Sequence, residues 1–290
     1  VMVSAAPSSV CANNPTTLTA VITQPGSVAA GNGTVTSSTY TPYYGSTTAA
    51  RRIQYLYTAA ELSALGLRAG PVTSLSFDIA AVPAAMLITD FTLKIGHTTA
   101  SVLTSTFSSA PAQTVYAGPY SPTVGFNKHV FTTPFVWDGV SNIVVEACHG
   151  VVGVASLTTA RYTSGLPTGI SVYSTNAAGC TQATGTTTTI RANIIFEGPK
   201  DVTSLYTNFV WNDGVGNVGT NNDTTIVQPA FPSGNTMTYT VTATDASGCT
   251  ATGSVVVNRN LTTPSATASA SQTNICAGIG VTLSANATNG

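Results

Sequence analysis

The chain has 290 residues, which is enough for two domains of ordinary size. Only 7% of the residues are charged and the formal net charge is −1, so no electrostatic footprint for nucleic acid or an anionic membrane is present. Hydrophobic residues make up 43%, which excludes a disordered chain, and the abundance of Thr and Val favours strands. No apolar run approaches the roughly 18 residues of a membrane span, and Val1 does not open a signal peptide. We therefore expect an all-β protein whose export signal, if any, lies outside these residues.

One stretch occurs twice. Val10–Ala20 and Ile275–Ala285 coincide after a shift of 265 residues at the cysteine, the following alanine, the Thr-Leu pair and the last alanine. This self-similarity predicts one complete repeat and the opening of a second. We expect residues 1–30 and 199–260 to form one discontinuous outer domain, residues 31–198 an inserted domain, and residues 261–290 a linker with the start of the next repeat.

In chain order, Leu18, Ala20 and Ile22 alternate with smaller residues, as in a strand with one buried face, and Pro25-Gly26 is expected to end it. In the insert, Thr58-Ala59-Ala60-Glu61 fits a capping box in which the Glu61 carboxylate reaches back to the Thr58 amide. Gly66 supplies a left-handed stop, so a short helix is predicted between them.

Strands of the insert are predicted from alternating apolar residues separated by Pro-rich and Gly-rich breaks, over 72–79, 91–95, 128–131 and 143–148. This spacing suits a sandwich or jelly roll. In the outer domain, residues 209–211 are expected to form a central strand, and residues 237–243 and 249–257 a hairpin. Residues 260–270 are interpreted as a linker.

Five cysteines in a chain of this composition are interpreted as disulfide partners, since no Cys-x-x-Cys spacing suggests a metal site. We predict the pairs Cys148–Cys180 and Cys11–Cys249, with Trp211 packed on the second. Cys276, the counterpart of Cys11, is expected to find its partner beyond Gly290.

Evidence for catalysis is absent from the motifs: the three histidines are scattered, and no nucleophile pattern adjoins them. We predict that the protein is not an enzyme and that Glu146 pairs with Arg161 or Arg191. Asp213 and Asp223 lie in Asn/Asp/Gly clusters that suit either calcium or ordinary turns. No other cofactor is expected.

The insert is also rich in tyrosine. Exposed together, these rings would stack on sugars and make the insert a carbohydrate-binding module, whereas alternate members would otherwise fill the core. The residues are Tyr40, Tyr43, Tyr44, Tyr55, Tyr57, Tyr116 and Tyr120.

Two pairs of phrases carry a family resemblance. Ser9-Val10-Cys11 with Thr17-Leu18-Thr19-Ala20, and residues 239–245 with Ser247-Gly248-Cys249-Thr250, resemble the two halves of immunoglobulin-like or PKD-like repeats in giant surface proteins of Bacteroidetes. Residues 52–62, 72–77 and 134–142 are similar to a β-sandwich module of the same proteins. The resemblance implies an immunoglobulin-like sandwich interrupted by an inserted jelly-roll-like β-sandwich.

The same resemblance implies an extracellular, cell-surface location, export by the type 9 secretion system and a structural and adhesive role, as in the SprB-like adhesins of gliding cells. Expected partners are neighbouring repeats or subunits, joined in part by strand addition, and surface glycans. Asp223-Thr224-Thr225 resembles the O-glycosylation pattern of these bacteria, with Thr224 as the acceptor. The alternative function is a carbohydrate-binding module on a secreted protein.

Overall fold

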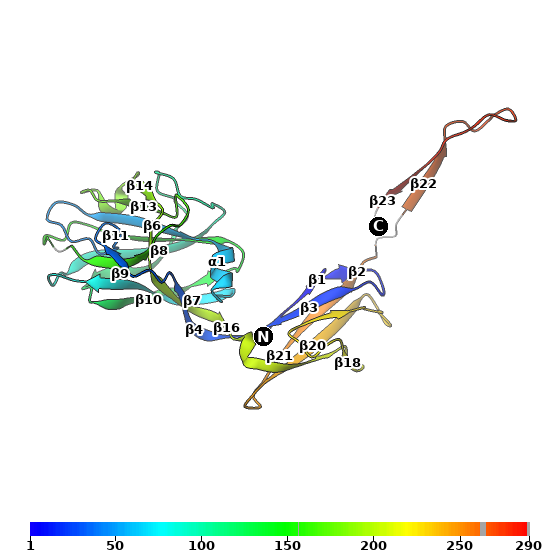
Figure 1. Ribbon diagram of the computed structural model, residues 1–290, viewed down its shortest axis with the longest axis horizontal. Coiled ribbons are helices and arrows are strands. Elements are labelled where there is room, and N and C mark those ends of the chain that lie inside the picture. The colour runs from blue at the N-terminus through cyan, green and yellow to red at the C-terminus, as the bar shows by residue number, and fades with distance from the viewer. Residues whose placement is uncertain (156, 262–264, 289–290) are drawn as a thin grey trace. The chain divides into compact units, whose positions relative to one another are not determined.

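A computed structural model describes residues 1–155, 157–261 and 265–288. It divides into two compact units, Val1–Ile22 with Thr203–Gly290 (unit 1) and Thr23–Val202 (unit 2), and both are built from sheets (Figure 1). Strands account for 54% of the structure and helix for 4%, so the predicted all-β sandwich fold is confirmed.

Unit 1 packs a three-stranded sheet against a five-stranded one. The first has the order β1 (Met2–Ala6), β3 (Thr16–Val21) and β19 (Thr224–Val227). The second has the order β18 (Asn217–Val218), β17 (Tyr206–Asn212), β20 (Thr236–Asp245), β21 (Thr250–Arg259) and β2 (Ser9–Val10), and η2 (Thr203–Leu205) precedes β17. Alternation puts Leu18 and Ala20 of one sheet and Trp211, Tyr239 and Val241 of the other in the core.

The N-terminal segment of unit 1 changes sheets. Strand β1 pairs antiparallel with β3, and β2, which follows at once, pairs parallel with the end of β21, Val10 lying opposite Arg259. The predicted hairpin after residue 237 is formed by β20 and β21 around a turn at Asp245, whose carboxylate accepts from the amides of Ser247 and Cys249.

Strands β22 (Ser265–Ala270) and β23 (Leu283–Thr288) form a separate two-stranded sheet. Ser265–Ala270 therefore belongs to a strand, contrary to the linker predicted for residues 260–270; residues 262–264 lie outside the described part. The strand was missed because its Ser, Ala and Thr side chains give no large apolar alternation.

Unit 2 is a two-sheet sandwich. One sheet has the order β15 (Arg191–Ala192), β12 (Thr159–Thr163), β7 (Gly70–Ala81), β16 (Ile194–Asp201) and β4 (Thr23–Ala30), with β10 (Gly125–Trp137) also on β7 and β5 (Val35–Ser37) on β12. The other has the order β14 (Thr186–Thr188), β13 (Ser171–Ser174), β6 (Arg51–Tyr57), β11 (Asn142–His149), β8 (Ile88–Thr98) and β9 (Gln113–Tyr120). A large aromatic core that includes Tyr55, Phe77, Phe91 and Trp137 fills the space between them.

The outer face of the six-stranded sheet is also covered, which gives it a second, smaller core. Leu56 and Val144 of the sheet pack there with Leu103 and Phe107, from the segment between β8 and β9, and with Ile170, which precedes β13. Because this sheet is buried on both faces, strand β11 is a nearly continuous buried run from Ile143 to His149.

Helix α1 (Ala59–Ala64) starts where the sequence predicts: the Thr58 hydroxyl accepts from the Glu61 amide at 3.2 Å, and Gly66 has a φ of +93°. The predicted return contact of Glu61 is wrong. Its carboxylate pairs with Arg191 instead, one oxygen lying 3.0 Å from Nη1, because a buried guanidinium offers a stronger partner than a backbone amide.

Strand β4 runs through Pro25-Gly26, which was expected to end a strand. It lies at the edge of its sheet, where a missing amide breaks no ladder, and its Pro25 is opposite Pro199 of β16. The division between the units therefore lies at residues 22/23 and 202/203, whereas the sequence placed it after residues 30 and 198.

Candidate functional site

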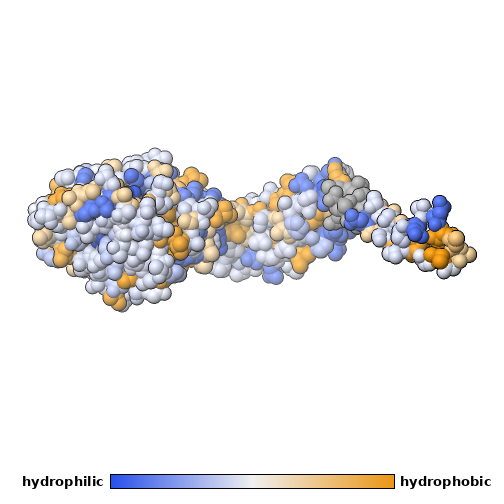
Figure 2. All heavy atoms as spheres, turned by 90° about the horizontal axis from the view of Figure 1, so that it is seen from above, coloured by the Kyte–Doolittle hydropathy of each residue, from blue (hydrophilic) through white to orange (hydrophobic). Residues whose placement is uncertain are grey.

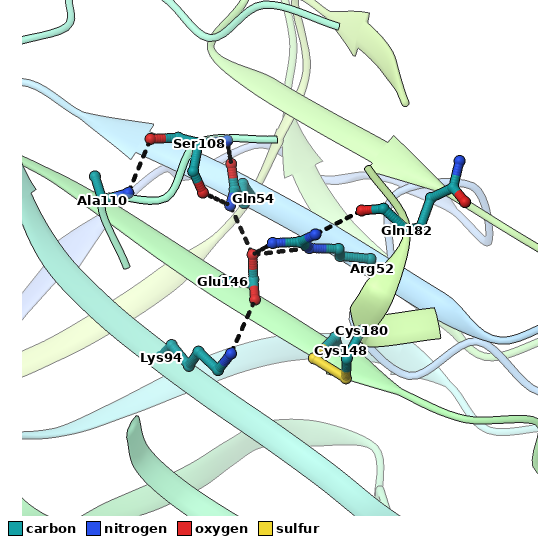
Figure 3. A network of polar contacts seen from close by, with 9 residues as sticks. All are labelled: Arg52, Gln54, Lys94, Ser108, Ala110, Glu146, Cys148, Cys180 and Gln182. Carbon is teal, nitrogen blue, oxygen red and sulfur yellow. Dashed lines mark hydrogen bonds and ion pairs between the residues drawn. A yellow bond between two sulfur atoms is a disulfide. The ribbon is translucent and has the colours of Figure 1, made fainter. Parts of the chain in front are cut away.

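A buried carboxylate on the outer face of the six-stranded sheet is the centre of a polar network. Glu146 of β11 is 1% exposed and lies opposite Gln54 of β6 and Lys94 of β8. One carboxylate oxygen accepts from Arg52 Nη2 at 2.7 Å, Arg52 Nε at 3.0 Å and Gln54 Nε2 at 2.6 Å (Figure 3). The other lies 3.8 Å from Lys94 Nζ.

Gln54 and Arg52 also bind two segments that lie over this face, one between β8 and β9 and the other between β13 and β14. Gln54 binds Ser108 through two hydrogen bonds, donating to its carbonyl at 2.7 Å and accepting from its amide at 2.9 Å. Arg52 donates to the Gln182 carbonyl and lies over the Phe107 ring at 4.5 Å. The Cys148–Cys180 disulfide, which forms as predicted, ties β11 to the segment of Gln182 beside this network (Figure 3).

This arrangement anchors chain segments, because both oxygens of Glu146 have cationic or amide neighbours that in turn bind those segments. The predicted partners of Glu146 are wrong, since Arg161 pairs with Asp78 and Arg191 with Glu61. Strand register decides the matter: Arg52 and Gln54 are on the neighbouring strand.

Arg52 and Gln54 were missed as site residues. The available signal is a polar side chain at alternate positions of an otherwise apolar strand, in step with Glu146 on the next hydrophobic run. That signal becomes specific only once β6 and β11 are known to pair.

A second buried polar pair lies in the core of unit 2. The Tyr43 hydroxyl and His129 Nε2 are 2.6 Å apart, and Phe91, Tyr116 and Tyr120 surround the imidazole. Burial lowers the pKa of His129 to about 3 and raises the pKa of Tyr43, so both groups are neutral near pH 7.

The tyrosines predicted either to bind sugars or to fill the core are divided. Tyr43, Tyr55 and Tyr57 are fully buried. The others, namely Tyr40, Tyr44, Tyr116 and Tyr120, are half-buried, and the last two pack against the core. These seven rings therefore do not form one exposed stacking platform.

The predicted Cys11–Cys249 disulfide is wrong: both cysteines are free and exposed, as is Cys276. Cys11 follows Val10, which pairs with Arg259 at the end of β21, whereas Cys249 immediately precedes the start of β21. Ten residues of extended strand span about 33 Å, far beyond the roughly 7 Å limit between bridged Cα atoms. Trp211 accordingly packs on no disulfide, and its indole donates to the Asn222 carbonyl at 2.9 Å.

The calcium candidates lie in turns of unit 1. The Asp213 carboxylate accepts from the amides of Val215 and Gly216, both at 2.9 Å, and these bonds lower its pKa. Asp223 is exposed, and its carbonyl accepts from the Ala20 amide. Within the described ranges, no three His, Cys, Asp or Glu side chains gather into a possible metal site.

The glycosylation candidate Thr224 is exposed on β19, which pairs only with β3 and forms an edge of its sheet. A glycan on its hydroxyl would therefore meet solvent.

Comparisons with known proteins give no relative: no family model, no curated protein and no solved structure matches the chain. In the part of the chain that the structure describes, no helix has the length and apolar character needed to cross a membrane.

Proposed function

We propose that this chain is a structural and adhesive repeat of a large extracellular filament or adhesin, exported by type 9 secretion and used by gliding cells. Its partners are neighbouring repeats or subunits of the same protein. It has no catalytic role.

The observation that carries the proposal is the structural equivalence of residues 266–288 and 1–23. Strands β22 and β23 pair in the register of β1 and β3: Thr267 lies opposite Asn286 and Ala270 opposite Leu283, as Met2 lies opposite Val21 and Ala5 opposite Leu18. A shift of 265 converts one set of pairs into the other.

The turns between these strands agree as well. The Asn14 amide donates to the Cys11 carbonyl at 3.1 Å, and the Ile279 amide donates to the Cys276 carbonyl at 3.1 Å. Asn13 has a φ of +64°, and its counterpart Gly278 has a φ of +88°. A left-handed residue at the same place indicates one conformation used twice.

Among the described residues, β22 and β23 pair only with each other, whereas the first hairpin belongs to a larger sheet whose inner face is buried. Leu18 is fully buried, whereas its counterpart Leu283 is 77% exposed, and Ile275, Ile279 and Val281 are exposed near it. Figure 2 shows hydrophobic residues gathered on the hairpin of β22 and β23. The apolar face fits a sheet like that of β17, β20 and β21, which a repeating polymer provides.

Localisation tests the proposal. Antibodies raised against residues 23–202 should label filaments on intact, unpermeabilised cells of the source organism, seen by immunogold electron microscopy. Labelling that requires permeabilisation would overturn it. A glycan array probed with the 290-residue chain tests the alternative function. Strong sugar binding, together with no filament labelling on intact cells, would favour a carbohydrate-binding module.

A further inference from the structure

Two of the three free cysteines of unit 1, Cys11 and Cys249, lie at opposite ends of one strand. Cys11 follows β2, and the Asn260 amide donates to the Val10 carbonyl at 2.7 Å, so Cys11 is level with the end of β21. Cys249 precedes the start of β21 and is held in its turn by the Asp245 carboxylate, 2.8 Å from the Cys249 amide. Both side chains are exposed.

Cys249 lies at the same end of the β-sandwich of unit 1 as Val1, the first residue of the repeat. A side chain at Gly253 would touch Val1 and Val3, so the first residues of β1 lie beside Gly253. Because β2 runs parallel to β21, the first segment advances in the direction of β21. Cys249 is four residues earlier on that line and therefore projects about 13 Å beyond the start of the repeat.

Chain length then fixes how close two consecutive repeats bring these thiols. The counterpart of Val1 is residue 266, seven residues after Arg259, which is at most about 24 Å of chain. The counterpart of Cys249 in the next repeat projects back over about 13 Å of that span, and Cys11 lies about one residue, roughly 3 Å, beyond Val10. Along the strand direction at most about 8 Å remains, and any bend in the linker shortens it toward the roughly 4.4–6.8 Å of a disulfide.

We propose that Cys11 of each repeat forms a disulfide with the Cys249 of the following repeat, so that a bond between repeats spans the linker. This inference rests on the proposed repeat function. It accounts for exposed thiols at both ends of the unit, and it assigns to Cys276 the same role one repeat further along.

The reaction is thiol–disulfide exchange. The thiolate of one cysteine attacks a sulfur of an oxidant disulfide, either a thiol oxidoreductase or a small molecule such as oxidised glutathione, and the second thiolate then displaces the oxidant's remaining sulfur. The two cysteines lose two protons and two electrons, and the oxidant is reduced to its two thiols. The Cys148–Cys180 disulfide forms by the same chemistry, which oxidising compartments favour.

A two-repeat chain tests the proposal. Residues 1–265 followed directly by residues 1–290 keep the natural spacing, and the 290-residue chain serves as the single-repeat control. Both are oxidised at low concentration with a glutathione redox buffer, and monomers are isolated by size exclusion. The two-repeat chain should fall from five free thiols, two in the first copy and three in the second, to three, whereas the single chain should keep all three.

Peptide mapping alone cannot say which copies are joined, because the repeats are identical, so matched variants decide it. Cys11→Ser in the first copy should abolish the bond, and Cys11→Ser in the second copy should leave it intact. Both copies of unit 1 should fold, as judged by the unfolding transition of Trp211. If both fold and five thiols still remain after oxidation, the proposed disulfide is overturned, but the repeat function is not. Loss of two thiols in the single chain would also overturn it. If the second copy of unit 1 fails to fold, the proposed repeat function itself is overturned.

Discussion

Replacing Glu146 by Gln should destabilise unit 2 by about 2–4 kcal/mol. The carboxylate is 1% exposed and accepts three hydrogen bonds of 2.6–3.0 Å from Arg52 and Gln54. Breaking a buried ion pair costs about 3–5 kcal/mol, because the remaining charge loses its compensation. The expected loss is somewhat smaller, since Gln keeps one acceptor oxygen and the side chains of Arg52 and Lys94 are 15% and 33% exposed.

Glu197→Gln is the matched control. Glu197 also pairs with a cation at 2.7 Å, Lys128, but the two side chains are 33% and 46% exposed. Exposed pairs contribute about 0–1 kcal/mol, so this variant should scarcely change stability.

Intrinsic fluorescence separates the units, because each contains one tryptophan: Trp137 in unit 2 and Trp211 in unit 1. In a Trp211→Phe background, urea unfolding followed through Trp137 reports unit 2 alone. Equal stabilities of the two glutamine variants would refute the reasoning that burial makes the Glu146 network important.

Three further outcomes are expected from urea unfolding, followed through Trp137 for unit 2 as above and through Trp211, in a Trp137→Phe background, for unit 1. Leu18→Ala should cost unit 1 about 2–5 kcal/mol, whereas Leu283→Ala should change little because that side chain is 77% exposed; equal effects would contradict the burial difference. Unit 2 should lose stability as the pH falls below about 6.5, because the folded-state pKa of His129 is about 3 and the unfolded chain binds the proton first. That penalty is about 3 kcal/mol at pH 4 and should shrink in His129→Phe, as comparison of midpoints at pH 7 and 4 would show. Thr58→Ala should cost about 1 kcal/mol through the lost helix cap, and an unchanged midpoint would argue against that cap.

Local patterns predicted the elements well. The alternation around Phe77, the Thr58 cap with Gly66, and the hairpin after Met237 all depend on residues close in sequence, and the structure has them where expected. The twofold occurrence of the cysteine stretch predicted the same local structure at both places, and in both a strand follows the stretch and pairs antiparallel with the strand before it.

Pairings between distant residues could not be predicted in the same way. Glu146 meets Arg52 because β11 pairs with β6 in one register, and a shift of one residue would place the carboxylate on the opposite face. Cys11 and Cys249 are separated by the length of β21 because β2 pairs with the far end of that strand. Both facts belong to strand order and register, which composition and spacing do not encode.

The parallel pairing of β2 with β21 has a mechanical consequence. If the unit is one of a chain of repeats, as we propose, tension along that chain would pull β2 and the end of β21 in opposite directions. The hydrogen bonds from Asn258 to Ser8 and from Asn260 to Val10, at 2.9 and 2.7 Å, must then break together in shear. The chain leaves and re-enters unit 1 at adjacent points, where the Ile22 amide donates to the Thr203 hydroxyl at 2.9 Å and Thr23 lies opposite Asp201. In such a chain the contact between Ile22 and Thr203 would carry the load past the insertion, so residues 23–202 would be spared the tension for as long as that contact holds.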